Sequence, residues 1–176
     1  HMAWLLEINY QGEDFYPVIR QKALEMALPH ADAVRYELMR NFGYYVTESS
    51  EHNAEYHPYF IKSTYPELIE RFAIPIDEYL RRCVAQIAGW EEQRDAIVHN
   101  GELTHVRSLE YASYIMDAIV TGKPTMIAGN VMNNGLISNL PTDSCVEVPC
   151  LVDKNGVQPT FVGDLPTQLA ALNRTN

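Results

Sequence analysis

The spacing of the apolar residues changes near Pro124, and this change constrains the fold most strongly. Before it, apolar residues recur at helical intervals, most clearly between Ile76 and Gly101. After it, short β-rich runs are separated by turn residues, and Asn155-Gly156 is typical of a hairpin connection. The pattern predicts an α+β protein with four or five helices beside a small mixed or antiparallel sheet.

Local start and stop signals divide the helical part. A helix is expected over Val18–Ala27, and a second over Asp32–Phe42 has Asp32 as its N-cap and Gly43 as its stop. A further helix is expected in SLEYASYIMDAIVTG, with Ser108 as its cap and Gly122 as its terminator.

Both ends of the chain also carry predictions. A turn centred on Gly12 predicts a strand and a short return in AWLLEINYQGEDFYP. The final TQLAALNRTN reads as the start of an amphipathic helix. It stops without Gly, Pro or a polar tail, which suggests a truncated chain.

Composition excludes several classes of protein. The 176 residues have room for one domain with a real core, and no apolar run reaches the length of a membrane span. The net charge of −10 repels phosphate backbones, so nucleic acid is not an expected partner. Three cysteines without C-x-x-C spacing are typical of reduced thiols, and with the absence of a signal peptide they favour a cytoplasmic protein.

The segment VTESSEHNAEYHPYF, residues 46–60, is both polar and aromatic. If Ser49 or Ser50 caps a helix, then Ser49 and His52, and His52 and Tyr56, share one face. That face would present hydroxyl, imidazole and phenol groups, which suits a polyhydroxylated ligand. A capped surface helix with its aromatic rings on the body explains the same spacing.

A second polar candidate is GNVMNNGLISNLPTDSCVEVP, in which Asn130, Asn133 and Asn134 follow or end a predicted strand. Amide side chains donate and accept hydrogen bonds, as sugar hydroxyls or a cofactor amide require. Asn is equally an ordinary turn residue. His1 is the third candidate, although His1-Met2 is also what a cleaved affinity tag leaves behind.

Several stretches together resemble the C-terminal half of a glycoside hydrolase of family 4. They include HMAW, VTESSEH, DEYLRRCVAQI, NLPTDSCVEVPC and LPTQLAALNRTN, in order from His1 to Asn176. The melibiase-type α-galactosidases, with the α-galacturonidases nearby, are the branch that the chain resembles most.

The resemblance implies a C-terminal domain like that of lactate and malate dehydrogenases, spanning residues 1–176, with the NAD-binding Rossmann domain upstream and absent from this chain. It also implies an unusual hydrolysis that needs NAD and Mn²⁺. The sugar's C3 hydroxyl is oxidised, a base removes the C2 proton, and the leaving group is eliminated. Water then adds and the ketone is reduced. Both cofactors would need the missing N-terminal half, so the 176-residue chain by itself is expected to be inactive.

Site residues carry over position by position from the resemblance. His1 corresponds to a metal ligand, and Tyr36 or Tyr44 is the expected catalytic base. The other implied contacts are with the sugar, and Asn130 also lies near the nicotinamide: Glu48, Ser49, His52, Asn130, Asn133 and Asn134. Met132 stands where relatives often have Arg, so a phosphorylated sugar is a less expected substrate.

Two other functions stay open. A non-catalytic sugar-binding or oligomerisation module derived from the family would keep the pocket wall without the chemistry. A dehydrogenase acting on a 2-hydroxy acid would share the architecture but lacks the His, Arg and Asp signature of that reaction. The expected partners are a small sugar substrate and, by resemblance, further copies of the chain in a homo-oligomer, with neither nucleic acid nor membrane.

Overall fold

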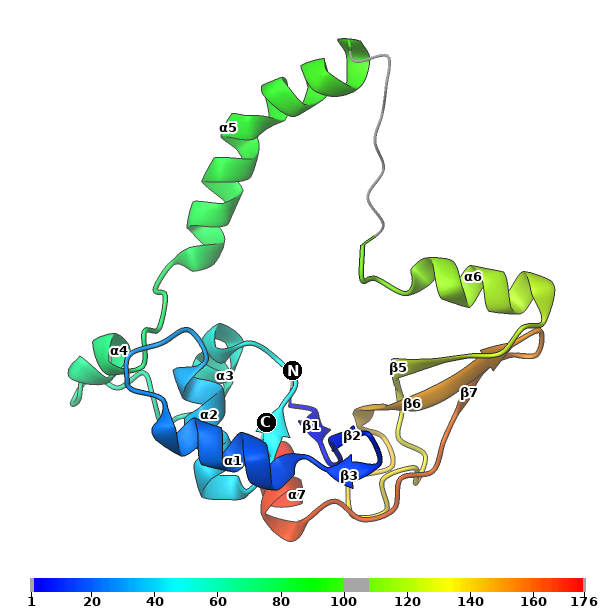
Figure 1. The fold of residues 1–176 in the computed structure, drawn as a ribbon, viewed down its shortest axis with the longest axis horizontal. Coiled ribbons are helices and arrows are strands. Elements are labelled where there is room, and N and C mark those ends of the chain that lie inside the picture. Colours follow the sequence, from blue (N-terminus) through cyan, green and yellow to red (C-terminus); the bar gives the residue numbers. More distant parts are fainter. Residues whose placement is uncertain (1, 100–107, 176) are drawn as a thin grey trace. The chain divides into compact units, whose positions relative to one another are not determined.

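A computed structural model describes residues 2–99 and 108–175 and confirms the α+β class (Figure 1). The chain divides into two compact units, residues 1–74 with 111–176 and residues 75–110. The described helices are α1 Tyr16–Glu25, α2 Ala33–Phe42, α3 Ser50–Tyr56, α4 Glu67–Arg71, α5 Glu78–His99, α6 Ala112–Thr121 and α7 Thr167–Arg174. The strands are β1 Trp4–Leu5, β2 Asn9–Tyr10, β3 Glu13–Asp14, β4 Tyr45–Val46, β5 Thr125–Met132, β6 Cys145–Asp153 and β7 Gly156–Pro159.

The strands pair in antiparallel fashion in three small sheets, β1–β4, β2–β3 and β5–β6–β7. The β2–β3 hairpin confirms the turn at Gly12, where Gln11 and Gly12 both have positive φ. The predicted hairpin between β6 and β7 is also confirmed. Its register pairs Asp153 with Gly156, so Lys154 and Asn155 make the turn and Gly156 takes the left-handed backbone, with φ of 96°.

Helix boundaries follow the stop signals more closely than the start signals. Gly43 and Gly122 both end their helices in the left-handed conformation, as predicted. Asp32 occupies the N-cap of α2, but its Oδ1 accepts from Arg35 Nη1 at 3.2 Å instead of capping a backbone amide. The helix predicted from Val18 begins earlier, at Tyr16, with Pro17 in its first turn and the Tyr16 amide bound to Asp14.

The prediction of Ser108 as the cap of α6 was wrong. Ser108 Oγ accepts from the Glu110 amide at 3.3 Å in a turn that precedes the helix, and Tyr111 occupies the cap position. The hydroxyl of Tyr111 donates to Ala128 O at 2.6 Å, which ties the start of α6 to β5. Gly101, expected to follow the end of α5, lies outside the described residues.

The core of the larger unit consists of separate buried clusters, each of which joins sequence-distant elements. One buried cluster brings Trp4 of β1 and Val46 of β4 together with Leu38 of α2 and Leu169 of α7. A second lies under the three-stranded sheet, where the alternate β6 residues Val146, Val148, Cys150 and Val152 are buried. This alternation leaves the other face of β5 and β6 open.

The smaller unit contains the 22-residue helix α5, the longest of the described helices. None of the side chains of α5 is buried. No helix among residues 2–99 and 108–175 is long and apolar enough to cross a membrane.

Candidate functional site

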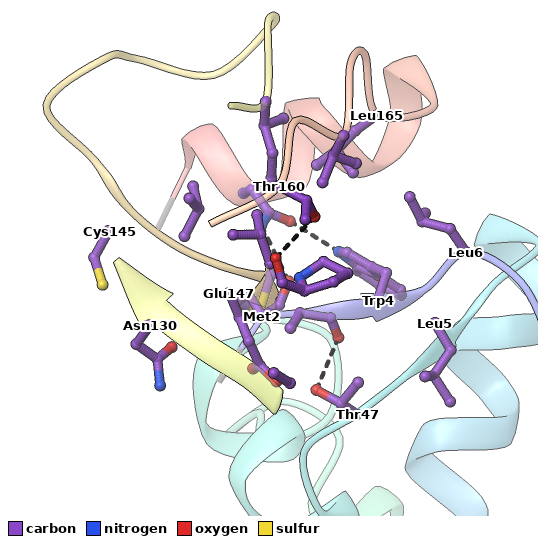
Figure 2. A pocket seen from close by; sticks show the side chains of 18 of the residues that line it. Met2, Trp4, Leu5, Leu6, Thr47, Asn130, Cys145, Glu147, Thr160 and Leu165 are labelled. Carbon is purple, nitrogen blue, oxygen red and sulfur yellow. Dashed lines mark hydrogen bonds between the residues drawn. The ribbon is translucent and has the colours of Figure 1, made fainter. Parts of the chain in front are cut away.

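A cavity of about 1150 Å³ lies in the larger unit and is lined by the N-terminal segment and by residues of β5 and β6 (Figure 2). Residues 2–7 form one wall, and the segment from Thr160 to Leu165 contributes to another. Its volume slightly exceeds the usual range for ligand pockets, about 300–1,000 Å³. Most of its wall is apolar, with a few polar side chains, the usual composition of a site that orients a small molecule.

Cross-strand pairing places two polar side chains on the cavity wall. Asn130 of β5 pairs directly with Glu147 of β6, and both line the cavity. In Figure 2 both side chains extend from neighbouring strands beside Cys145. An amide and a carboxylate side by side offer a donor and several acceptors, which is what vicinal hydroxyls of a sugar require.

Hydrogen bonds between distant segments hold the N-terminal wall. Thr47 donates to Ala3 O twice, from its amide at 2.9 Å and from its hydroxyl at 3.2 Å. Trp4 Nε1 donates to Asn173 Oδ1 at 2.9 Å, and Asn173 Nδ2 donates to Met2 O at 3.0 Å. Helix α7 and Thr47, which directly follows β4, therefore hold the backbone of residues 2–4 at the cavity wall (Figure 2).

The polar segment 46–60 contains the short capped helix α3, Ser50–Tyr56, next to this wall. Ser49 is the N-cap of α3, and its Oγ accepts from the His52 amide at 3.3 Å, which confirms the predicted capping role. Glu48 accepts from the Ser49 amide at 2.7 Å and lies 3.4 Å from His52 Nδ1. The Ser49 amide and, more weakly, His52 lower the pKa of the Glu48 carboxyl, so this group stays ionised near neutral pH.

Only the edges of this segment reach the cavity. The His52 ring makes an edge contact with Tyr56, with centroids 6.5 Å apart, and Tyr56 and Thr47 line the cavity. Glu48, Ser49 and His52 do not line it, although their neighbours do. The expected capped helix within 46–60 is thus confirmed over Ser50–Tyr56, and through Tyr56 it also borders the candidate site.

The two candidate bases lie elsewhere, in an aromatic cluster between α1 and α2. Tyr36 packs against Tyr45 with ring centroids 5.9 Å apart, and Tyr44 packs against Tyr16 at 5.7 Å. Burial raises the pKa of both Tyr16 and Tyr45, so these phenols stay protonated. Neither Tyr36 nor Tyr44 lines the cavity, and their catalytic role stays a prediction.

The three asparagines occupy three different environments. Asn130 is exposed on the cavity wall. Asn133 is completely buried: its Nδ2 donates to the carbonyl oxygens of Ile137, Leu140 and Pro141 at 2.9–3.2 Å, and its Oδ1 accepts from the Ile137 amide at 2.7 Å. Asn134 is an exposed turn residue with φ of 44°. Asn133 therefore positions the loop after β5, and its predicted sugar contact finds no support in this geometry.

The described residues do not form a metal site. No three His, Cys, Asp or Glu side chains of the described chain come close enough to hold an ion. His1, the predicted ligand, lies outside the described residues. Cys83, Cys145 and Cys150 are free thiols, as predicted. The part of the chain that the structure describes thus supplies no complete site for Mn²⁺.

Sequence reasoning missed Glu147 and Thr160 on the cavity wall. A signal for Glu147 was present: it is the single acid within the apolar run CVEVPC, on the face opposite the buried valines. Thr160 donates to Pro149 O at 2.8 Å and extends the wall beyond β7 (Figure 2). No sequence pattern predicts the position of Thr160 on the wall, because its contact with Pro149 depends on the β6–β7 pairing.

Comparison with known proteins assigns the chain to a class. Residues 1–176 match the model of the family 4 glycosyl hydrolase C-terminal domain, so the chain belongs to this family. It is 60% identical to an α-galactosidase of Bacillus subtilis, over 100% of this chain and 41% of that protein. It is 30% identical to an α-galactosidase of Rhizobium meliloti, over 97% of this chain and 37% of that protein.

Solved structures agree on the fold. A Thermotoga maritima 6-phospho-β-glucosidase, solved with manganese, NAD⁺ and glucose-6-phosphate, superposes with a TM-score of 0.62 at 17% identity. The match covers 97% of this chain and 38% of that chain. The chain therefore spans about two-fifths of the length of the relatives it matches.

Proposed function

We propose that this chain serves as the C-terminal domain of an α-galactosidase that uses NAD and Mn²⁺, with a Rossmann domain upstream. The observation that carries the proposal is the 60% identity to the Bacillus subtilis α-galactosidase along the whole chain. Support for the cofactors comes from the Thermotoga maritima relative, which was solved with manganese and NAD⁺. Because the chain matches 41% of the α-galactosidase, the full activity needs the remaining part of such a protein.

In this proposal the chain contributes one wall of the sugar site. Asn130 and Glu147 face the cavity from paired strands and would hydrogen-bond sugar hydroxyls. Tyr56 and Thr47 border the same space, and the His52 ring, which lies beside Glu48, makes an edge contact with Tyr56. We therefore keep Glu48, Ser49 and His52 as residues that shape this border, with Ser49 acting through its cap.

Met132 does not line the cavity, but it bears on which sugar the complete enzyme would accept. It lies on the same face of β5 as Asn130, two residues further along, and is 54% exposed. A thioether there offers no positive charge to a phosphate, whereas an Arg would bind one bidentately. We accordingly propose an unphosphorylated α-galactoside as the substrate, in a cytoplasmic enzyme that assembles as a homo-oligomer.

A chimera tests the proposal. This chain would replace the matching part of the Bacillus subtilis α-galactosidase, and hydrolysis of nitrophenyl α-galactoside would be measured with NAD⁺ and Mn²⁺ under reducing conditions. We expect hydrolysis that disappears when both cofactors are stripped and falls at least tenfold in N130A, with N155A, an exposed residue of the β6–β7 turn outside the cavity, as the matched control. Hydrolysis that persists without either cofactor would refute the proposed chemistry.

The alternative of a non-catalytic sugar-binding module rests on the cavity, which lies entirely within this chain. Titration of the purified 176-residue chain with galactose distinguishes the two. Submillimolar binding lost in N130A, together with a folded but inactive chimera, would favour the module.

A further inference from the structure

Residues from opposite ends of the chain meet at the cavity wall. Trp4 belongs to the stretch HMAW and Asn173 to the stretch LPTQLAALNRTN, two of the stretches that carry the family resemblance. The two residues are 169 positions apart in sequence, yet their side chains are hydrogen-bonded. Both lie in the larger unit and both line the cavity. The contact therefore joins the two ends of the chain at the candidate site.

The side-chain amide of Asn173 binds two groups of the N-terminal wall at once. Its Oδ1 accepts from Trp4 Nε1 at 2.9 Å, and its Nδ2 donates to Met2 O at 3.0 Å. The first bond holds the indole ring, and the second holds the backbone two residues earlier. Asn173 is half-buried on helix α7, whose Leu169 and Ala170 are buried, so the amide projects from an element that packs on the core.

The residue between these two bonds is held from the other side. The amide and the hydroxyl of Thr47 both donate to Ala3 O, at 2.9 Å and 3.2 Å. Trp4 is only 8% exposed and packs in the same buried cluster as Leu169 of α7. Asn173 thus binds both ends of the stretch 2–4, while Thr47 binds its centre.

The side chains of this stretch suit binding and not proton transfer. Met2, Ala3 and Trp4 carry no titratable side chain, so they can pack against a sugar but cannot exchange a proton with it. A residue that only positions this wall therefore affects the binding of substrate and of transition state equally. Loss of such uniform binding raises KM and leaves kcat unchanged.

We propose that Asn173 is a positioning residue of the sugar site, which holds residues 2–4 in the arrangement that binds the galactoside. The inference rests on the proposed function, because it requires the sugar to occupy this cavity. Both ends of the Asn173 amide are engaged with the wall, so the side chain acts through Met2 and Trp4.

Steady-state kinetics of the chimera described above test this role. N173A removes both hydrogen bonds to the wall, so we expect KM for nitrophenyl α-galactoside to rise roughly fivefold or more, with kcat changed by less than about twofold. KM does not depend on the concentration of folded enzyme. A partly unfolded variant would lower the apparent kcat and would not reproduce this result.

Gln168 provides a matched control on the same helix. Its Nε2 donates to Phe42 O at 3.0 Å, the same distance as from Asn173 Nδ2 to Met2 O. Neither Gln168 nor Phe42 lines the cavity, so Q168A removes an amide-to-carbonyl bond of α7 away from the wall. We expect Q168A to leave KM and kcat unchanged.

A double-mutant cycle with Trp4 tests whether Asn173 acts through the wall. W4F removes the indole N–H that Asn173 accepts from. Because W4F and N173A remove the same bond, the rise in KM for the double variant should be smaller than the product of the two single rises. A rise equal to that product would mean that Asn173 does not act through Trp4.

The remaining outcomes separate this role from the proposed function. If the chimera hydrolyses the galactoside and KM is equal in N173A and Q168A, the role of Asn173 is refuted and the proposed function stands. If the wild-type chimera is folded but inactive, the proposed function fails, and titration of the 176-residue chain with galactose decides the role of Asn173. Weaker binding by N173A than by Q168A would support that role, whereas equal binding, or no binding by the wild-type chain, would overturn it.

Discussion

At the scale of single residues, the asparagines of the segment GNVMNNG have different structural roles. The sequence predicted correctly that Asn130 and Asn134 would lie near a strand end and a turn. It could not separate Asn133 from them, because the carbonyls that Asn133 binds come from residues 137–141 and become convergent only when the loop closes. The residue type of these asparagines indicated that they form hydrogen bonds. The partners of those bonds are visible only in the tertiary structure.

This difference predicts unequal effects of one substitution at adjacent positions. N133D removes the donor that serves three carbonyls and places a carboxylate in a fully buried site, so we expect a loss of about 3 kcal/mol or more in the free energy of unfolding. N134D keeps a residue that tolerates positive φ on the surface and should change stability by less than about 0.5 kcal/mol. Urea denaturation of both variants measures this; equal losses would contradict the loop-positioning role.

The buried imidazole of His57 predicts how stability depends on pH. His57 is 3% exposed, burial lowers its pKa, and its Nε2 has no hydrogen-bond partner among the described residues. The His57 ring therefore stays neutral in the folded state, whereas in the unfolded state it gains a proton below about pH 6.5. Stability contributed by the neutral ring should be complete above that pH and fall on acidification, until the pH reaches the lowered pKa of the folded state.

Comparing the wild-type chain with H57Q isolates this group from the other histidines. The difference in free energy of unfolding, measured from pH 8 to pH 5, should shrink as the pH falls below about 6.5. A difference that is independent of pH would mean that His57 is protonated equally in both states.

At the scale of elements, stop signals were more informative than start signals. Glycine at the end of α2 or α6 adopts a left-handed backbone that other residues reach only with strain. The end of each helix can therefore be predicted from the local sequence. Ser108 and Asp32 both bind other partners, because a short polar side chain has several alternatives nearby. The pairing of β1 with β4, across forty residues, has no local signal at all.

The β5–β6 pair predicts a tight packing constraint at Gly129. A Cβ at this position would lie 2.8 Å from the buried Sγ of Cys150. We expect G129A to destabilise the chain by about 1–3 kcal/mol through overpacking. C150A removes the obstructing sulfur. The free energy of unfolding of the double variant G129A/C150A should therefore be higher than the sum of the two single effects predicts. A strictly additive result in this cycle would show that the contact is not what excludes alanine.

At the scale of the whole molecule, the fold class followed from apolar periodicity, and the family followed from long sequence matches. The candidate site could be predicted only in part, because the cavity combines the N-terminal segment, β5, β6 and residues 160–165. Asn130 was found from its motif, while Glu147 and Thr160 depend on strand pairing. The aromatic cluster around Tyr36 and Tyr44 shows why residue type alone did not locate a base.

The most direct test of the account is the substrate preference of the chimera described above. With NAD⁺ and Mn²⁺ present, kcat/KM would be measured for nitrophenyl α-galactoside and for the same glycoside phosphorylated at C6. Met132 leaves the open face of β5 without a cation, so we expect the unphosphorylated galactoside to be preferred at least tenfold. An equal or greater kcat/KM for the phosphorylated glycoside would contradict it.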